Sequence, residues 1–209
     1  MDQKGEEGKK DGIVTVKIAL VSFCEIGVEI MTKYLQSSFV DDYNETLGIR
    51  FIERQITVKN TPVNLVLWTF GKGKNCMDML KIICEGAHVV MLAFDLADNV
   101  SLKSLRDIYK AAYQLNHDAK YFLVGTKFDL YFELPDNEKK SITEYAKKFA
   151  EAIEAEALIY CSEAKSINIK KLFQLMIGSA FGLTPKCDQI DDYNKPILIL
   201  KSREEKTTS

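Results

Sequence analysis

The chain has 209 residues, of which 46% are hydrophobic and 28% charged, and its formal net charge is -2. That length suits one substantial core with tails and leaves little room for a second compact domain. The near-neutral charge gives no general attraction to nucleic acid or anionic lipid. We therefore expect protein partners that recognise local surface, and no nucleic-acid partner.

No segment of the sequence has the pattern of a membrane anchor or a targeting signal. The apolar stretches Ile18–Val21 and Val89–Phe94 are far shorter than a membrane-spanning helix, which needs about 20 residues. Residues 1–12 are charged and lack the apolar centre of a secretory signal, and the final residues Glu205–Ser209 contain no cysteine for prenylation. We expect a cytoplasmic protein without a direct membrane anchor.

The cysteines and histidines are too scattered to predict a metal site. The five cysteines form no C-x-x-C pair, and the two histidines lie in unrelated contexts. Zinc sites and disulfide frameworks need regular spacings of these residues. We therefore predict no metal ligands.

Along the first third of the chain, apolar runs of strand length alternate with a segment of helical period. Val14–Val21, rich in β-branched residues, is the first predicted strand, and a helix runs through Ile30–Gln36. The polar segment Ser37–Leu47 is predicted as a long loop. Gly48–Val58 and Val63–Phe70, joined by a short turn, form the single antiparallel hairpin that we expect.

The rest of the chain continues the alternation that a mainly parallel sheet flanked by helices produces. Further strands are predicted at His88–Phe94, Tyr121–Val124 and Leu158–Cys161, and further helices at Lys74–Glu85, Ser101–Asn116, Lys139–Ala155 and Ile167–Phe181. We expect a three-layer α/β domain over residues 13–184, with six mostly parallel strands and one antiparallel edge hairpin. Residues 1–12 and 185–209 are predicted tails, and the apolar patch Pro196–Leu200 leaves open whether the second tail is mobile or docked along an edge.

Two short motifs at strand ends suggest recognition of a guanine base. Gly125–Asp129 ends the fifth predicted strand, and Cys161–Lys165 follows the sixth. A carboxylate at Asp129 would accept hydrogen bonds from N1 and N2 of guanine, which adenine does not offer, while the stem of Lys127 would lie over the ring. The alternative is structural, with Asp129 capping backbone amides and Lys127 bridging loops. The candidate base-binding residues are Thr126, Lys127, Asp129, Ser162, Ala164 and Lys165.

The element order and these motifs resemble the Ras-like G domain of small GTPases, a P-loop fold. Four stretches, Asp42–Ile49, Phe94–Leu96, Phe122–Leu130 and Tyr160–Asn168, are similar to the septation and mitotic-exit GTPases of fungi and protists. In that family the active protein recruits a kinase cascade at the spindle pole or its equivalent. The resemblance implies signalling linked to cell division, a kinase, regulator or scaffold bound through the switch-loop surfaces, and recruitment to such an organising centre through a partner.

The phosphate-binding pattern of that family, G-x-x-x-x-G-K-[ST], is largely missing. At its place stands Ser22–Glu29, in which Gly27 alone is retained. Ser22 replaces the first glycine, Val28 replaces the lysine that reaches the phosphates, and Glu29 replaces the hydroxyl that holds magnesium. One lost charge-assisted contact removes about 1.5 to 3 kcal/mol. Glu29 has a structural reading as well, because an acidic residue near a helix N-terminus stabilises the helix dipole.

The second switch departs from the family independently. The D-x-x-G motif reads Thr69-Phe70-Gly71-Lys72, so that Thr69 stands for the metal-shell aspartate and Lys72 for the glycine that senses the γ-phosphate. Gly73 occupies the place of the glutamine that orients water. Thr46 of the first switch is retained. We therefore expect neither Mg²⁺ binding nor GTP hydrolysis.

These observations predict a pseudo-GTPase, a scaffold or adaptor with weak or no GTP binding. The alternative is a genuine switch that binds GTP or GDP through an atypical phosphate site, with Lys72 or Lys74 partly replacing the missing lysine. Guanine nucleotide binding without magnesium overlaps both hypotheses. The residues that separate them are Val28, Glu29, Thr69 and Lys72.

Overall fold

The computed structural model describes residues 13–22, 26–35, 41–44, 49–70, 76–183 and 187–201. Three parts of the predicted site, Thr46, Lys72 and Gly73, lie outside these residues. Among the described residues, no helix is long and apolar enough to cross a membrane.

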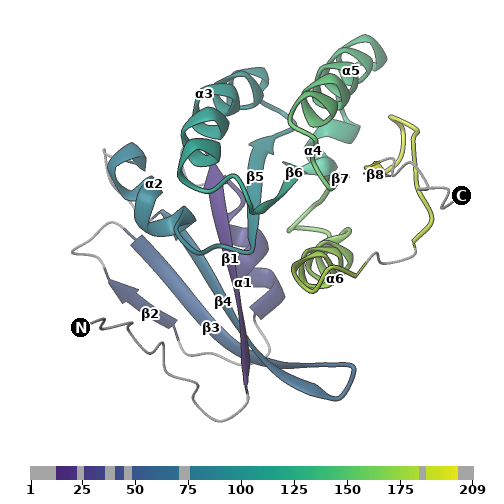
Figure 1. Cartoon of the computed structure of the whole chain (residues 1–209). Helices are drawn as coiled ribbons and strands as arrows, with labels where there is room; N and C mark the ends of the chain where they lie inside the picture. Colours follow the sequence, from purple (N-terminus) through teal and green to yellow (C-terminus); the bar gives the residue numbers. More distant parts are fainter. Residues whose placement is uncertain are drawn as a thin grey trace, which may run out of the picture.

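One mixed sheet forms the centre of the domain (Figure 1). In the described part of the chain it has eight strands in the order β2-β3-β4-β1-β5-β6-β7-β8. The strands are β1 Val14–Ser22, β2 Asp41–Asn44, β3 Ile49–Val58, β4 Thr61–Phe70, β5 Val89–Asp95, β6 Lys120–Thr126, β7 Ala157–Tyr160 and β8 Leu198–Leu200. The five strands from β4 to β7 in this order are parallel, which confirms the predicted fold class.

The predicted count of six strands and one antiparallel pair was too low. Besides the hairpin of β3 and β4, the pairs β2–β3 and β7–β8 are antiparallel. β2 lies inside the segment predicted as a loop, and β8 lies inside the predicted C-terminal tail. Both are short edge strands that pair with one neighbour, and a hydrophobic period does not reveal such strands.

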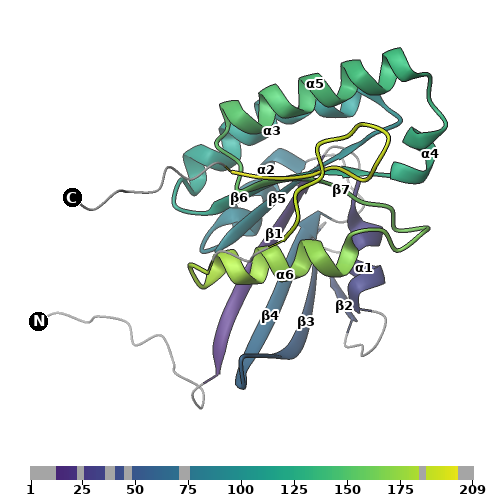
Figure 2. The ribbon, with the colours of Figure 1, turned by 90° about the vertical axis from the view of Figure 1, so that its right-hand side faces the viewer.

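Six helices among the described residues cover the two faces of the sheet. They are α1 Val28–Leu35, α2 Cys76–Cys84, α3 Asn99–Leu115, α4 Phe128–Phe132, α5 Asp136–Ala152 and α6 Ile169–Ala180. Figure 2 shows α3 and α5 on one side of the sheet and α1 and α6 on the other. The predicted three-layer arrangement is therefore present.

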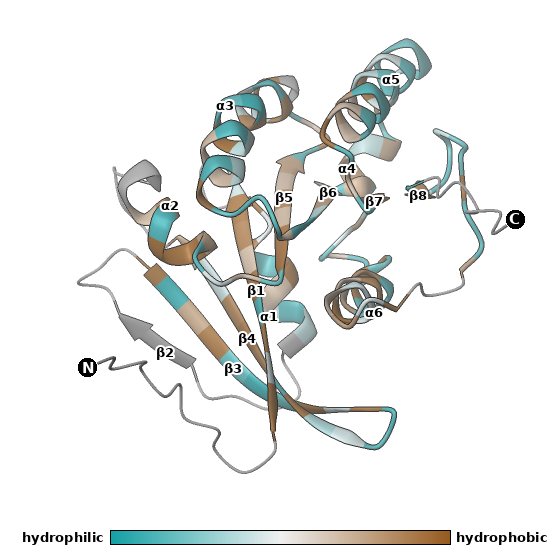
Figure 3. Ribbon diagram, in the orientation of Figure 1, coloured by the Kyte–Doolittle hydropathy of each residue, from teal (hydrophilic) through white to brown (hydrophobic). Residues whose placement is uncertain are grey.

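Strand alternation divides the buried side chains into two cores, one on each face. In β1, Ala19 and Val21 belong to the core under α2, α3 and α5, whereas Ile18 and Leu20 belong to the core under α1 and α6. Because successive residues of a strand point to opposite faces, a strand covered on both sides must be apolar throughout. Figure 3 accordingly shows predominantly hydrophobic residues along the central strands.

One helix was not predicted, and another begins earlier than predicted. Phe128–Phe132 forms the short helix α4, which the sequence pattern did not indicate, and α5 begins at Asp136 instead of Lys139. Pro135 precedes that helix with a φ of -58°, which is suited to a helix start, and Asp136 lies in the first turn, where a negative charge is favoured. Lys139 lies one turn on, with its ammonium 2.9 Å from the Asp136 carboxylate.

The described part of the C-terminal tail docks along the edge of the sheet. Ile197 and Leu198 are buried, and the amide of Tyr160 donates a hydrogen bond to the carbonyl of Ile197. The ammonium of Lys201 lies 2.8 Å from the carboxylate of Glu154. Of the two arrangements that the sequence left open for this tail, mobile or docked along an edge, residues 187–201 adopt the docked one.

Candidate functional site

The candidate site lies where the parallel strands end. The carboxyl ends of β1, β5 and β6 lie side by side, and the loops that follow them carry most of the predicted site residues (Figure 1). In open α/β sheets, ligands bind in the crevice outside these strand ends.

Gly27 lies in a backbone conformation that side chains disfavour. Its φ is +84°, and its carbonyl accepts a hydrogen bond from the amide of Ile30, which starts α1. An added Cβ would lie 2.9 Å from the Cβ of Ala93 on β5. The turn before α1 thus needs glycine for steric reasons alone.

The two residues after Gly27 give the first turn of α1 an apolar and an anionic side chain. Val28 is half-buried and packs against the core shared with α6, and Glu29 is exposed. The charge of Glu29 contributes to raised pKa values of Lys127 and Glu163 in the base-recognition loops. The carboxylate of Glu29 therefore acts electrostatically on the base-recognition loops.

Lys127 is held by an acidic residue that sequence reasoning did not select. Its ammonium donates a hydrogen bond to Asp95 at the end of β5, at a distance of 2.7 Å. This hydrogen bond raises the pKa of Lys127, and the charges of Glu163 and Glu29 act in the same direction. Asp95 lies in register with Thr126, the residue before Lys127. Only the pairing of β5 with β6 reveals this partner.

Asp129 and Ser162, one from each of the two motifs, are in contact. The Ser162 hydroxyl donates a hydrogen bond of 2.5 Å to Asp129 and accepts one of 3.0 Å from the amide of Lys165. Thr126, whose hydroxyl donates to the Phe94 carbonyl at 3.1 Å, is buried, whereas Ala164 and Lys165 are exposed. The structure thus brings both predicted base motifs together.

Glu163 is a second acidic residue that the prediction missed, although it lies inside the second motif. Burial raises the pKa of its carboxyl, and the charges of Glu29 and Asp129 add to this effect. Its Oε2 atom is buried without a hydrogen-bond partner among the described residues. In the described part of the site, carboxylates therefore outnumber ammonium groups.

The first position of the phosphate loop and the position of the metal-shell aspartate both carry buried neutral hydroxyls. Ser22 ends β1 and Thr69 lies near the end of β4, and each is 1% exposed. Neither hydroxyl has a hydrogen-bond partner within the described ranges. No cluster of three potential metal ligands occurs among the described residues. A threonine at position 69 supplies no charge to organise a magnesium shell.

The fold is that of a Ras-like small GTPase. The chain belongs to the Ras family, which it matches over residues 17–181. It is 32% identical over 186 residues to septum-promoting GTP-binding protein 1 of Schizosaccharomyces pombe. The aligned region covers 88% of this chain and 93% of that protein.

Two other Ras-related proteins share a lower identity with the chain. The chain is 24% identical over 163 residues to GTP-binding protein YPTM1 of Zea mays, covering 77% of this chain and 75% of that protein. It is also 24% identical over 122 residues to Ras-related protein Rab-7b of Bos taurus, and this aligned region covers 56% of this chain and 61% of that protein. Ras-family GTPases bind protein effectors and regulators, and protein partners are therefore the general expectation.

Proposed function

We propose that this Ras-family chain is a pseudo-GTPase that serves as a signalling scaffold or adaptor and binds GTP weakly or not at all. The observation that carries the proposal is the start of α1, where Val28 and Glu29 occupy the positions of the phosphate lysine and the magnesium hydroxyl. The carboxylate of Glu29 acts electrostatically on Lys127 and Glu163 in the base-recognition loops. A triphosphate would therefore meet an apolar side chain where the family provides an ammonium, and a carboxylate where it provides a hydroxyl.

The energetic consequence is large compared with the affinity that a base pocket alone supplies. Loss of one charge-assisted contact removes about 1.5 to 3 kcal/mol, which corresponds to about ten- to hundredfold in affinity. Repulsion by Glu29 acts in the same direction, and Thr69 leaves the metal shell without its carboxylate. Hydrolysis needs charge neutralisation on the transferred phosphoryl group and an oriented water molecule, and we assign neither role to a described residue.

The base pocket is compatible with a structural role. Ser162 joins Asp129 to the backbone of Lys165, and Lys127 joins Asp95, so that these side chains tie the loops after β5, β6 and β7 together. In the proposed function these contacts fix the loops in one arrangement. Ala164 and Lys165 are exposed and would contact guanine if nucleotide binds, whereas Thr126 is buried and supports the loop through its hydrogen bond to Phe94.

The name of the Schizosaccharomyces pombe relative links that protein to septum formation. As part of the proposal, we assign the present chain to signalling of the same kind. In this proposal the domain presents its switch-loop surfaces to a kinase, regulator or scaffold in the cytoplasm. A protein partner brings it to the spindle pole or an equivalent centre.

The test is to repair the phosphate site and measure nucleotide affinity. Val28→Lys with Glu29→Thr restores an ammonium and a hydroxyl, and we expect guanine nucleotide binding to strengthen by about tenfold or more. Binding of a fluorescent GDP analogue measures this change, with adenine nucleotide as competitor. Glu144→Thr, which removes an exposed carboxylate on α5, is the matched control and should leave affinity unchanged. In the repaired protein, Asp129→Ala should abolish the gain.

Two outcomes bear on the alternatives. Tight, magnesium-dependent binding by the unmodified chain would replace the proposal with the guanine-nucleotide switch. A repaired protein that still fails to bind would show that the base pocket also serves only as structure, which agrees with a scaffold.

A further inference from the structure

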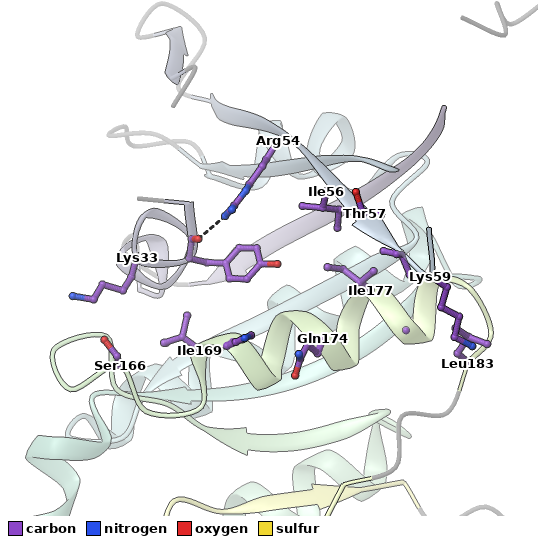
Figure 4. Close-up of a pocket in the computed structure, with 14 residues that line it drawn as sticks. Lys33, Arg54, Ile56, Thr57, Lys59, Ser166, Ile169, Gln174, Ile177 and Leu183 are labelled. Atoms are coloured by element: carbon purple, nitrogen blue, oxygen red, sulfur yellow. Dashed lines mark hydrogen bonds between the residues drawn. The ribbon is translucent and has the colours of Figure 1, made fainter. Parts of the chain in front are cut away.

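A groove of about 880 Å³ lies on the face of the sheet covered by α1 and α6, apart from the candidate nucleotide site. Figure 4 shows its walls, formed by the end of α1, by β3 with the turn that follows it, and by α6. The predicted partner surfaces are the switch loops, and this groove belongs to neither of them. An inference from it is therefore independent of the proposed function.

The floor of the groove is apolar and well supported. Ile169 and Ile177 on α6 are buried, and Ile56 on β3 is half-buried. The ring of Tyr34 on α1 stacks on Phe173, with centroids 3.7 Å apart and planes 8° from parallel. Arg54 donates a hydrogen bond of 2.9 Å to the Tyr34 carbonyl and places its guanidinium 5.4 Å from the ring centre. These contacts form the groove before any partner binds.

The rim of the groove carries charge of one sign. Lys33, Arg54, Lys59 and Lys170 line it, and no carboxylate occurs among its described lining residues. Within the described part of the chain, the three lysines form no ion pair. Lys33 lies at one end of the groove and Lys59 at the other, beside Leu183 (Figure 4). The cations are therefore spread along an apolar floor.

We propose that this groove binds an acidic amphipathic segment of a partner protein. A single anionic headgroup would engage one end of the groove, whereas cations at both ends match a segment whose carboxylates are distributed along its length. Apolar side chains at helical spacing would lie on Ile56, Ile169 and Ile177, as in other helix-in-groove interfaces. The sequence of residues 1–12 is a poor match, because it mixes lysines with acidic residues and has no apolar residue after Met1.

The experiment uses the full chain without nucleotide, so that its result is separate from that of the nucleotide test. The probe is a synthetic helical peptide with leucines on one face and glutamates flanking them. The control peptide has the same sequence with each glutamate replaced by lysine. Backbone amide shifts should report binding of the acidic peptide at α6 and β3, with affinity falling as salt is raised. The lysine peptide should not bind.

The decisive variant reverses two cations of the rim. Lys59→Glu with Lys170→Glu should weaken binding of the acidic peptide by about tenfold. Position 170 lies in the first turn of α6, where an acidic residue is favoured, so the fold should be retained. Lys103→Glu with Lys148→Glu changes two exposed lysines on α3 and α5 by the same charge and should leave affinity unchanged.

Three results would overturn the proposal. An equal loss of peptide affinity in the two double variants would mean that the acidic peptide is attracted non-specifically to surface lysines. Absence of peptide binding together with sedimentation on phosphatidylserine vesicles, abolished by Lys59→Glu with Lys170→Glu, would make the groove a membrane contact. Shifts of the α6 amides on removal of residues 1–12 would mean that the chain's own N-terminal segment fills the groove.

Discussion

Substitution of Gly27 by alanine tests whether this glycine is retained for packing or for a phosphate. The φ of +84° costs a residue with a Cβ about 1 to 2 kcal/mol. The added Cβ would also lie 2.9 Å from that of Ala93, well inside the usual carbon contact distance, and such overpacking costs about 1 to 3 kcal/mol. The two effects together predict a loss of about 2 to 5 kcal/mol in the free energy of unfolding.

Two other glycines separate these effects. Gly86 has a φ of +64° with no atom near its potential Cβ, so Gly86→Ala should show the backbone cost alone. At Gly125, whose φ is not positive, an added Cβ would lie 2.8 Å from Leu96 and 2.9 Å from Tyr160, so Gly125→Ala should show the packing cost alone. Urea unfolding without nucleotide measures all three variants. For a domain of this size, 1 kcal/mol corresponds to about 2–4 °C in Tm.

The packing explanation requires Gly27→Ala to be more destabilising than Gly86→Ala. Equal losses would show that contact with Ala93 is relieved at little cost. Gly27 would then need another reason for its retention, and close approach of a ligand would be the first to consider.

Three further changes test other parts of the structure. Asn116→Ala should cost about 1 to 3 kcal/mol in urea unfolding, because its amide donates to the carbonyls of Cys84 and Ala87 at 2.8 and 2.9 Å; an unchanged midpoint would contradict this. Ile197→Ala should cost about 2 to 5 kcal/mol if residues 187–201 are an integral part of the fold, whereas a neutral result would make their docking incidental. Glu163→Gln should stabilise the protein near neutral pH, because burial raises the pKa of this carboxyl and its ionisation therefore opposes folding. The advantage of that variant should shrink as pH falls through the raised folded-state pKa towards the unfolded value; an advantage that grows instead would reverse the assigned sign.

The sequence predicted the central sheet because its strands are covered on both faces and must be continuously apolar. The hairpin was also predictable, since Lys59 and Asn60 form its turn with φ values of 46° and 65°, and asparagine tolerates that conformation. β2 and β8 were missed because each is an edge strand of a few residues. Their positions depend on the strand beside them, which local pattern does not encode.

Within the site, the sequence predicted the two motifs at strand ends but not the contact of Asp129 with Ser162, which depends on the pairing of β6 with β7. Asp95 and Glu163 were also missed. Asp95 follows an apolar strand with nothing in its local sequence to indicate Lys127 as its partner, and the contact arises from the register of β5 and β6. The raised pKa of Glu163 arises from burial, which requires the folded structure.

The central claim is that the phosphate site no longer binds nucleotide strongly, and thermal unfolding of the unmodified protein tests it most directly. A ligand that binds only the folded state stabilises it by RT ln(1 + [L]/Kd), which reaches about 2.7 kcal/mol at a hundredfold excess over Kd. We predict that Tm is the same with and without millimolar GTP or GDP and magnesium. A magnesium-dependent rise of several degrees with guanine but not adenine nucleotides would contradict the account.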